Sequence, residues 1–221
     1  MPDMTINHAG KSISGYLAEP ANPRGGMIVI QEWWGLNDDI RGIADRYAAE
    51  GYLAFAPDLY HGTLATEPDE ARKLAMSLER QIAAEEIDTV IDWMKQDRGI
   101  GKVGCVGFCM GGGLTLATAM RPTSNVDAVH VYYGGGMPEG DALKGIKVPT
   151  MGSYGGEDQG IPKEKVDALR DALTAAGTPN DIKLYDGAKH SFFNSGPAHH
   201  EAASADSWER SKEWFGKYVA S

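Results

Sequence analysis

The stretch that decides the fold is VGCVGFCMGGG, which spans residues 103–113. An apolar segment, 103–108, runs into a Gly-x-Cys-x-Gly turn centred on Cys109, and the helix-forming segment 114–120 follows at once. A strand, a sharp turn and a helix in this order form an elbow that presents a nucleophile at its tip. The pentapeptide also arises by chance in glycine-rich loops. The helix would direct its N-terminal amides and positive dipole end at Cys109, which favours a thiolate or an oxyanion there.

Apolar segments alternate with segments of helical periodicity along the rest of the chain. Short continuous apolar runs are typical of strands buried on both faces. Strands are expected at 13–18 (at an edge of the sheet), 26–31, 52–56, 102–108, 128–133, 149–154 and 181–185. Helices are expected at 38–49, in one long region from 66 to about 94, at 114–120, near 166–173 and near 208–218. This alternation predicts a single α/β domain over residues 1–221, with a mostly parallel sheet covered by helices on both faces.

Composition and charge narrow the class of protein. The chain has 221 residues and a net charge of −10, which argues against nucleic acid as a partner because a phosphate backbone attracts clustered Lys and Arg. Residues 1–10 lack the basic and apolar regions of a signal peptide, and no apolar run approaches a membrane span. Cys105 and Cys109 would lie too far apart on an extended strand for a disulfide. A reduced, cytoplasmic protein with no membrane partner is expected.

Two further polar residues follow successive predicted strands. Asp158 lies in the loop 155–162, and His190 lies in the loop 187–193. Because the carboxyl ends of parallel strands meet at one edge of a sheet, these side chains should approach Cys109. The order nucleophile, acid, histidine is that of a hydrolytic triad. Glu157 is the competing acid, and Asp158 taken alone is better explained as a turn residue or as the cap of a helix that begins near Pro162.

A metal centre is a weaker interpretation of the histidines. A set made of His190, His199 and His200 matches no metal-ligand spacing, and the last two are expected to be ordinary surface residues. Cys105 has the surroundings of a small core residue on a strand. Neither a metal nor an organic cofactor is therefore expected.

With these residues placed, the chain resembles the dienelactone hydrolase family over nearly its whole length. The matching segments are QEWWGL at 31–36, APDLY at 56–60, VGFCMGG at 106–112, GED at 156–158 with Pro162, and HSF at 190–192. The resemblance implies an α/β-hydrolase fold with no large cap domain and a carboxylic ester hydrolase of carboxymethylenebutenolidase type. In this family's scheme Cys109 is the nucleophile, His190 the base and Asp158 its orienting carboxylate.

The resemblance also assigns a role to Glu32, which would contact the resting cysteine and move when substrate arrives. A loop carboxylate facing water is the alternative for this residue. The backbone amides of Trp33 and Met110 would form the oxyanion hole. Trp33 and Trp34 would wall the pocket, although plain packing against the adjoining helix explains them as well.

Tyr60 and Ser191 complete the implied substrate-binding set. The arginine that the family carries four residues past the catalytic histidine is replaced here by Asn194. Arg72 and Arg80 occupy no alignable position, so the sequence does not predict which group would hold a substrate carboxylate.

The choice of sulfur suggests the class of ester. A thiol, with a pKa of about 8.5, ionises readily but is also a good leaving group, so an alkoxide competes poorly with it for departure. An enolate departs more easily, and activated esters and enol lactones are therefore the expected small-molecule substrates of a monomeric enzyme. A general carboxylesterase or thioesterase with a cysteine nucleophile is the first alternative. A non-catalytic binding protein on the same scaffold is the second.

Overall fold

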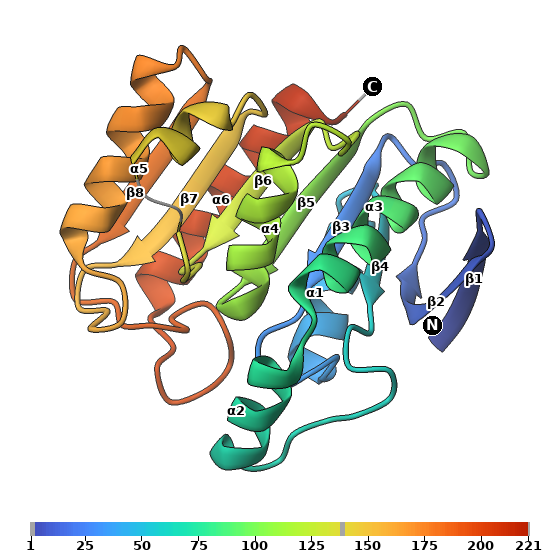
Figure 1. The fold of residues 1–221 in the computed structure, drawn as a ribbon, viewed down its shortest axis with the longest axis horizontal. Helices are drawn as coiled ribbons and strands as arrows, with labels where there is room; N and C mark the ends of the chain where they lie inside the picture. The colour runs from blue at the N-terminus through green and yellow to red at the C-terminus, as the bar shows by residue number, and fades with distance from the viewer. Residues whose placement is uncertain (1–2, 138–139, 221) are drawn as a thin grey trace.

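A computed structural model describes residues 3–137 and 140–220 of the chain. It contains an eight-stranded sheet with the order β1-β2-β4-β3-β5-β6-β7-β8 (Figure 1). The strands are β1 (Asp3–His8), β2 (Lys11–Ala18), β3 (Gly26–Ile30), β4 (Leu53–Pro57), β5 (Val103–Phe108), β6 (Ala128–Tyr132), β7 (Thr150–Gly155) and β8 (Asn180–Tyr185). Neighbouring strands from β4 to β8 pair in parallel, whereas β2 pairs antiparallel with both β1 and β4. The prediction of a mostly parallel sheet is confirmed.

Helices cover both faces of this sheet (Figure 1). They are α1 (Asp38–Ala49), α2 (Pro68–Ser77), α3 (Arg80–Gln96), α4 (Met110–Met120), α5 (Lys163–Ala175) and α6 (Glu201–Tyr218), with a 3₁₀ helix, η1 (Gly140–Gly145). On one face α1 packs against α6, and the rings of Tyr47 and Trp208 lie 4.8 Å apart. On the other face lie α3, α4 and α5. The central strands β3 to β6 are buried along their whole length, which explains their continuous apolar sequences.

Two predicted elements are wrong in detail. The strand expected at the sheet edge, 13–18, is internal because β1 pairs outside it, with Ile6 opposite Ile13. The long helical region expected from residue 66 is two helices, α2 and α3, because the chain becomes extended at Leu78, which lies between them. Of the α2 residues only Ala71 is buried, so this helix contributes little apolar surface to the core.

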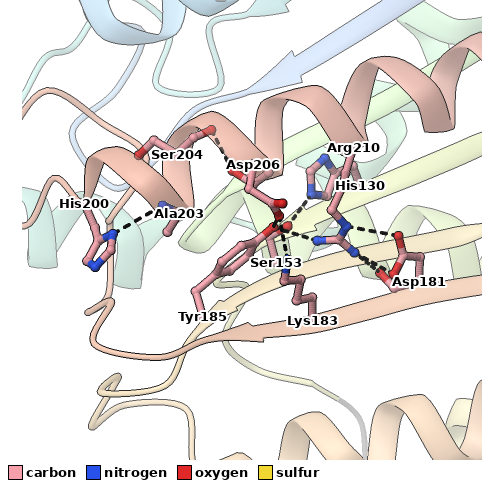
Figure 2. Close-up of polar contacts among 11 residues, drawn as sticks. His130, Ser153, Asp181, Lys183, Tyr185, His200, Ala203, Ser204, Asp206 and Arg210 are labelled. Atoms are coloured by element: carbon pink, nitrogen blue, oxygen red, sulfur yellow. Dashed lines mark hydrogen bonds and ion pairs between the residues drawn. The ribbon is translucent and has the colours of Figure 1, made fainter.

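Polar contacts between β8 and α6 hold both ends of the loop 186–200, which carries His190 (Figure 2). Arg210 forms an ion pair with Asp181 at 2.6 Å and donates a hydrogen bond to the Tyr185 hydroxyl at 2.7 Å. Asp206 accepts hydrogen bonds from Lys183 at 2.8 Å and from Tyr185 at 2.7 Å. The last residues of β8 are therefore tied to α6, which limits how far the intervening loop can shift.

Candidate active site

The site is built around Cys109, which lies at the turn between β5 and α4. Its backbone has φ 53° and ψ −115°, a conformation that residues with a side chain rarely adopt and that costs about 1–3 kcal/mol. The Cys109 N–H donates to the Tyr132 carbonyl at 3.1 Å, and the Cys109 carbonyl accepts from the Gly113 N–H at 3.2 Å. These bonds from β6 and α4 hold the turn, and the predicted elbow is present.

The glycines of the elbow are explained by close backbone approach. A Cβ atom on Gly107 would lie 2.2 Å from the Gly111 carbonyl oxygen, and one on Gly111 would lie 2.4 Å from the Gln31 carbonyl oxygen. Both distances are far below van der Waals contact. The first turn of α4 can therefore lie directly against the end of β3, which brings Cys109 close to the segment that follows β3.

The predicted acid and histidine come together at the carboxyl ends of β7 and β8. His190 Nδ1 lies 2.6 Å from Asp158 Oδ2, and the Asp158 side chain is only 2% exposed. The other carboxylate oxygen of Asp158 accepts a hydrogen bond from the Gly160 N–H at 2.8 Å. The imidazole and the Cys109 side chain line the same cavity, and the interaction with Cys109 raises the pKa of His190. Asp158, and not the exposed Glu157, is therefore the carboxylate that contacts His190.

The surroundings of His190 change its affinity for a proton. Burial by itself lowers the pKa of His190, but hydrogen bonds to Asp158 and Cys109 and the charges of both groups raise it more, to about 10. Because the unfolded chain has the ordinary value of 6.5, folding strengthens proton binding at this residue. The resulting stabilisation is complete below pH 6.5 and is lost as the pH rises through about 10.

We expect the pKa of His190, followed by NMR of its ring protons, to fall in Cys109→Ala and to fall in Asp158→Asn. Each variant removes one of the two groups that raise the pKa. The exposed His199 provides an internal reference in the same titration. An unchanged His190 pKa in both variants would contradict the contacts described here.

Glu32 is buried at the start of the segment that follows β3, with 4% of its surface exposed. Its Oε1 accepts from the Ser191 hydroxyl at 3.3 Å, and its Oε2 accepts from the Asn194 side-chain amide at 3.0 Å. Burial raises the pKa of Glu32, and the hydrogen bond from Asn194 partly opposes that rise. The alternative of a water-facing loop residue is wrong. The hydrogen bonds that hold the carboxylate come from the His190 loop, not from Cys109 as the resemblance implies.

The two backbone amides that the resemblance assigns to an oxyanion hole are both free of hydrogen bonds in the described residues. The N–H groups of Trp33 and Met110 have no hydrogen-bond partner within the described part of the chain. Met110 is the first residue of α4, where an N–H has no acceptor in the helix. Backbone amides without an internal acceptor are what an oxyanion hole requires.

Glu32, Trp33, Cys109 and His190 border a cavity of about 690 Å³. Its walls come from the segment after β3, the segment before α2, the elbow and the loop before α6. The lining residues are Glu32, Trp33, Trp34, Asn37, Asp39, Leu64, Ala65, Thr66, Cys109, His190, Ser191, Asn194, Ser195, Gly196, Pro197 and Ala198. The cavity thus contains the predicted nucleophile and base, both tryptophans and Ser191.

Comparison with known proteins gives the family of this chain. The sequence pattern of the dienelactone hydrolase family matches residues 13–219. The chain belongs to the dienelactone hydrolase family. A "putative carboxymethylenebutenolidase" from Salmonella typhimurium is 32% identical to it over 234 residues, covering 97% of this chain and 86% of the relative. "Protein usf" from Aquifex pyrophilus is 31% identical and covers 95% of each chain.

Solved structures agree with this assignment. The crystal structure of a "putative dienelactone hydrolase" from Klebsiella pneumoniae superposes with a TM-score of 0.86, at 29% identity and with 98% of each chain covered. This member of the dienelactone hydrolase family has the α/β-hydrolase fold, and the residues described here include no cap domain. The predicted enzyme class, a carboxylic ester hydrolase, is confirmed at the level of the family.

Tyr60 lies outside the cavity wall of this dienelactone hydrolase family member. The side chain is buried, and its hydroxyl donates to the Met110 sulfur at 3.3 Å. Burial and the nearby charge of Cys109 raise its pKa to about 12. Tyr60 therefore packs against the elbow, and its predicted contact with substrate is not part of this arrangement.

Some residues of the site had no signal in the sequence. Asn194 stands out only as the residue found where the family carries arginine, and the wall segments 64–66 and 194–198 have no periodicity. Tyr133 packs its ring 5.1 Å from that of His190. Its place at the carboxyl end of a predicted strand is a signal that could have found it.

The other cysteine and histidines lie in ordinary structural positions. Cys105 is buried beside Thr115, and burial raises its pKa to about 12. His200 caps α6 by accepting a hydrogen bond from the Ala203 N–H, while His199 contacts the Asn194 carbonyl. Over residues 3–137 and 140–220, no group of three or more His, Cys, Asp or Glu could hold a metal ion. No helix there is both long and apolar enough to cross a bilayer.

Proposed function

We propose that this protein is a single-domain hydrolase of activated esters or enol lactones, with Cys109 as nucleophile, His190 as base and Asp158 as the carboxylate that orients it. One observation carries the proposal. The imidazole of His190 is hydrogen-bonded to a buried carboxylate, and it lines the same cavity as the elbow sulfur, whose interaction with it raises the pKa of His190. This is the geometry of a nucleophile, a base and an orienting acid.

The proposed reaction is acyl transfer through a thioester. The Cys109 sulfur attacks the ester carbonyl carbon, and the carbonyl oxygen becomes an oxyanion held by the N–H groups of Trp33 and Met110. Collapse breaks the acyl carbon–oxygen bond, and protonated His190 gives its proton to the departing oxygen and becomes neutral. His190 then takes a proton from water, whose oxygen attacks the thioester. The acid product leaves, and sulfur is released for the next cycle.

Sulfur should favour esters with a stabilised leaving group. In the tetrahedral intermediate a thiolate departs more readily than an alkoxide, so an alkyl ester tends to return to substrate. An enolate or phenolate departs readily enough for the forward reaction to compete. This preference is the proposal's substrate class, and a general carboxylesterase is its main competitor.

The test uses three uncharged esters of butyric acid: vinyl, 4-nitrophenyl and ethyl. We expect kcat/KM for the vinyl and nitrophenyl esters to exceed that for the ethyl ester by at least about 100-fold, which corresponds to roughly 2.7 kcal/mol of barrier difference. Each ester is also assayed with Cys109→Ala, which separates hydrolysis that requires Cys109 from background hydrolysis. Faster turnover of the ethyl ester would contradict the proposed preference, and activity independent of Cys109 would contradict the nucleophile.

Glu32 is proposed to assist by exchanging a proton with the cysteine during substrate binding. Glu32→Gln is therefore expected to lower kcat/KM for the vinyl ester at least tenfold. The glutamine amide can still donate to Ser191 and accept from Asn194, so the fold should be retained.

The same variant gives a readout independent of activity. Burial raises the pKa of Glu32, so its contribution to stability is complete below its ordinary value of 4.5 and is lost as the pH rises through the folded value. The Tm of Glu32→Gln should therefore rise relative to wild type between pH 4.5 and neutral pH. Glu213→Gln, at an exposed position on α6, is the matched control, and its Tm should change with pH in the same way as that of wild type. Parallel Tm curves for Glu32→Gln and wild type would contradict the burial argument.

A further inference from the structure

The charges around the cavity indicate what kind of molecule it accepts. Among the described side chains, no lysine or arginine lines it. Its ionisable lining residues are Glu32, Asp39, Cys109 and His190. The only one of these that can carry a positive charge is His190, whose charge is balanced by the Asp158 carboxylate at 2.6 Å. A substrate carboxylate would therefore meet no free cation in this wall.

Two cations of neighbouring segments line other cavities. Arg46 lies behind the segment 193–195, where its guanidinium is 4.0 Å from the centre of the Trp208 ring and 5.1 Å from that of Phe193. It lines a neighbouring cavity, not the one that contains Cys109. Lys189 lines another cavity, on the Asp158 side of His190. Neither side chain is placed to neutralise an anion beside the sulfur.

Negative charge is instead fixed in the wall. Asp39, in the first turn of α1, accepts a hydrogen bond from the Ser195 hydroxyl at 2.7 Å, which holds the carboxylate against the loop before α6. Asn194 supplies only a neutral amide, and that amide is already bonded to Glu32. An anionic substrate would be repelled by Asp39 without compensation, and desolvating its carboxylate would add a further cost.

The rest of the wall is apolar. Trp33 and Trp34 meet edge to face with ring centroids 5.2 Å apart, and Leu64, Ala65 and Pro197 contribute further carbon surface. Leu64 is 52% exposed, which is unusual for a large apolar side chain in this protein. Exposed apolar surface beside a cavity is typical of a place where an apolar ligand group binds.

We propose that the substrate of this site is an uncharged ester or lactone with an apolar body, and that Asp39 helps to exclude carboxylated substrates. The inference rests on the proposed function, because it concerns the substrate of the Cys109 site. It predicts that the enzyme distinguishes two esters of similar shape by the charge that one of them carries. That discrimination depends on a residue outside the Cys109–His190–Asp158 group.

The experiment compares esters that differ in charge. The first pair is methyl 4-acetoxybenzoate and 4-acetoxybenzoate, with the charge on the leaving group; the second is phenyl hexanoate and the monophenyl ester of adipic acid, with the charge on the acyl chain. Each kcat/KM is divided by the rate constant for hydroxide-catalysed hydrolysis, which removes differences in intrinsic reactivity. In both pairs we expect the uncharged member to be favoured at least tenfold.

Two variants then test the source of the discrimination. Asp39→Asn keeps an oxygen that can accept from Ser195 but removes the negative charge, and it should raise the anionic-to-neutral ratio about threefold or more, because the repulsion of an anion in the cavity is removed. Asp38→Asn is the matched control. It removes the same charge one residue away, from a side chain that does not line this cavity, and it should leave the ratio near the wild-type value.

The outcomes separate this inference from the proposed function. Suppose that an anionic ester is hydrolysed as well as its neutral partner, and that Cys109→Ala abolishes this reaction. The inference would then be overturned, and the proposed function would stand. If no ester is hydrolysed in a reaction that requires Cys109, both the inference and the proposed function are overturned. The role given to Asp39 would be overturned if Asp39→Asn left the anionic-to-neutral ratio unchanged. It would also be overturned if Asp38→Asn changed that ratio equally.

Discussion

Cys109→Ala is expected to lower kcat/KM for 4-nitrophenyl butyrate by at least about 10³-fold, since the acyl group then has no sulfur to which it can transfer. Cys109→Ser should also lose most of the activity. A hydroxyl ionises far less readily than a thiol, and the surroundings hold a sulfur-sized group against His190. Both variants should fold, because neither substitution changes the backbone hydrogen bonds of the elbow.

The second cysteine provides the control for this experiment. Cys105 lies four residues away on the buried strand β5, and its side chain contacts Thr115 outside the cavity. Cys105→Ala should lower Tm slightly through lost packing and retain the hydrolytic activity. Iodoacetamide should modify wild type and Cys105→Ala at one site, located by mass spectrometry, and should inactivate both. Full activity in Cys109→Ala, or inactivation without modification of Cys109, would contradict the proposed nucleophile.

Gly111→Ala is expected to destabilise the protein by about 3 kcal/mol, at the upper end for overpacked interiors. The added Cβ would lie 2.4 Å from the Gln31 carbonyl oxygen and 2.6 Å from that of Ile30, and both are backbone atoms of the central sheet region that a rotamer change cannot move. For a chain of this size the loss corresponds to a Tm lower by roughly 6–12 °C. Displacement of the segment after β3 should also lower activity, because Glu32 and Trp33 follow Gln31 directly.

The matched control is Gly42→Ala, at another helical glycine. A Cβ there meets no atom within 4 Å, and alanine has the higher helix propensity by about 1 kcal/mol. Tm measured by calorimetry should rise slightly for Gly42→Ala and fall strongly for Gly111→Ala. If both variants unfolded at the wild-type temperature, α4 would not lie as close to β3 as described.

The parts of the site that the sequence predicts are those encoded by local geometry. The glycines around Cys109 mark a turn with no room for side chains, and Asp158 and His190 each follow a strand that the apolar pattern identifies. The carboxyl ends of parallel strands lie at the same edge of a sheet, so residues that follow successive strands in the sequence lie close together in space. The ambiguity between Glu157 and Asp158 is resolved only in three dimensions, where one carboxylate is buried against His190 and the other is exposed.

Other features depend on contacts between distant segments, and they leave no local pattern. The partners of Glu32 lie about 160 residues away, so nothing near position 32 indicates Ser191 or Asn194. Strand β1 was missed because Ile6 is its only fully buried residue, and its pairing with β2 decides its conformation. Tyr60 lies next to a strand end, but its ring turns under the elbow toward Met110 instead of into the cavity.

One short loop segment, 190–194, carries the imidazole that contacts the sulfur and also both side chains that hold the Glu32 carboxylate. A substitution that shifts this segment therefore alters two proton-binding groups together. Titration data from such variants will report the joint behaviour of the pair. A change outside this segment, such as Asp158→Asn for His190, is needed to alter one group by itself.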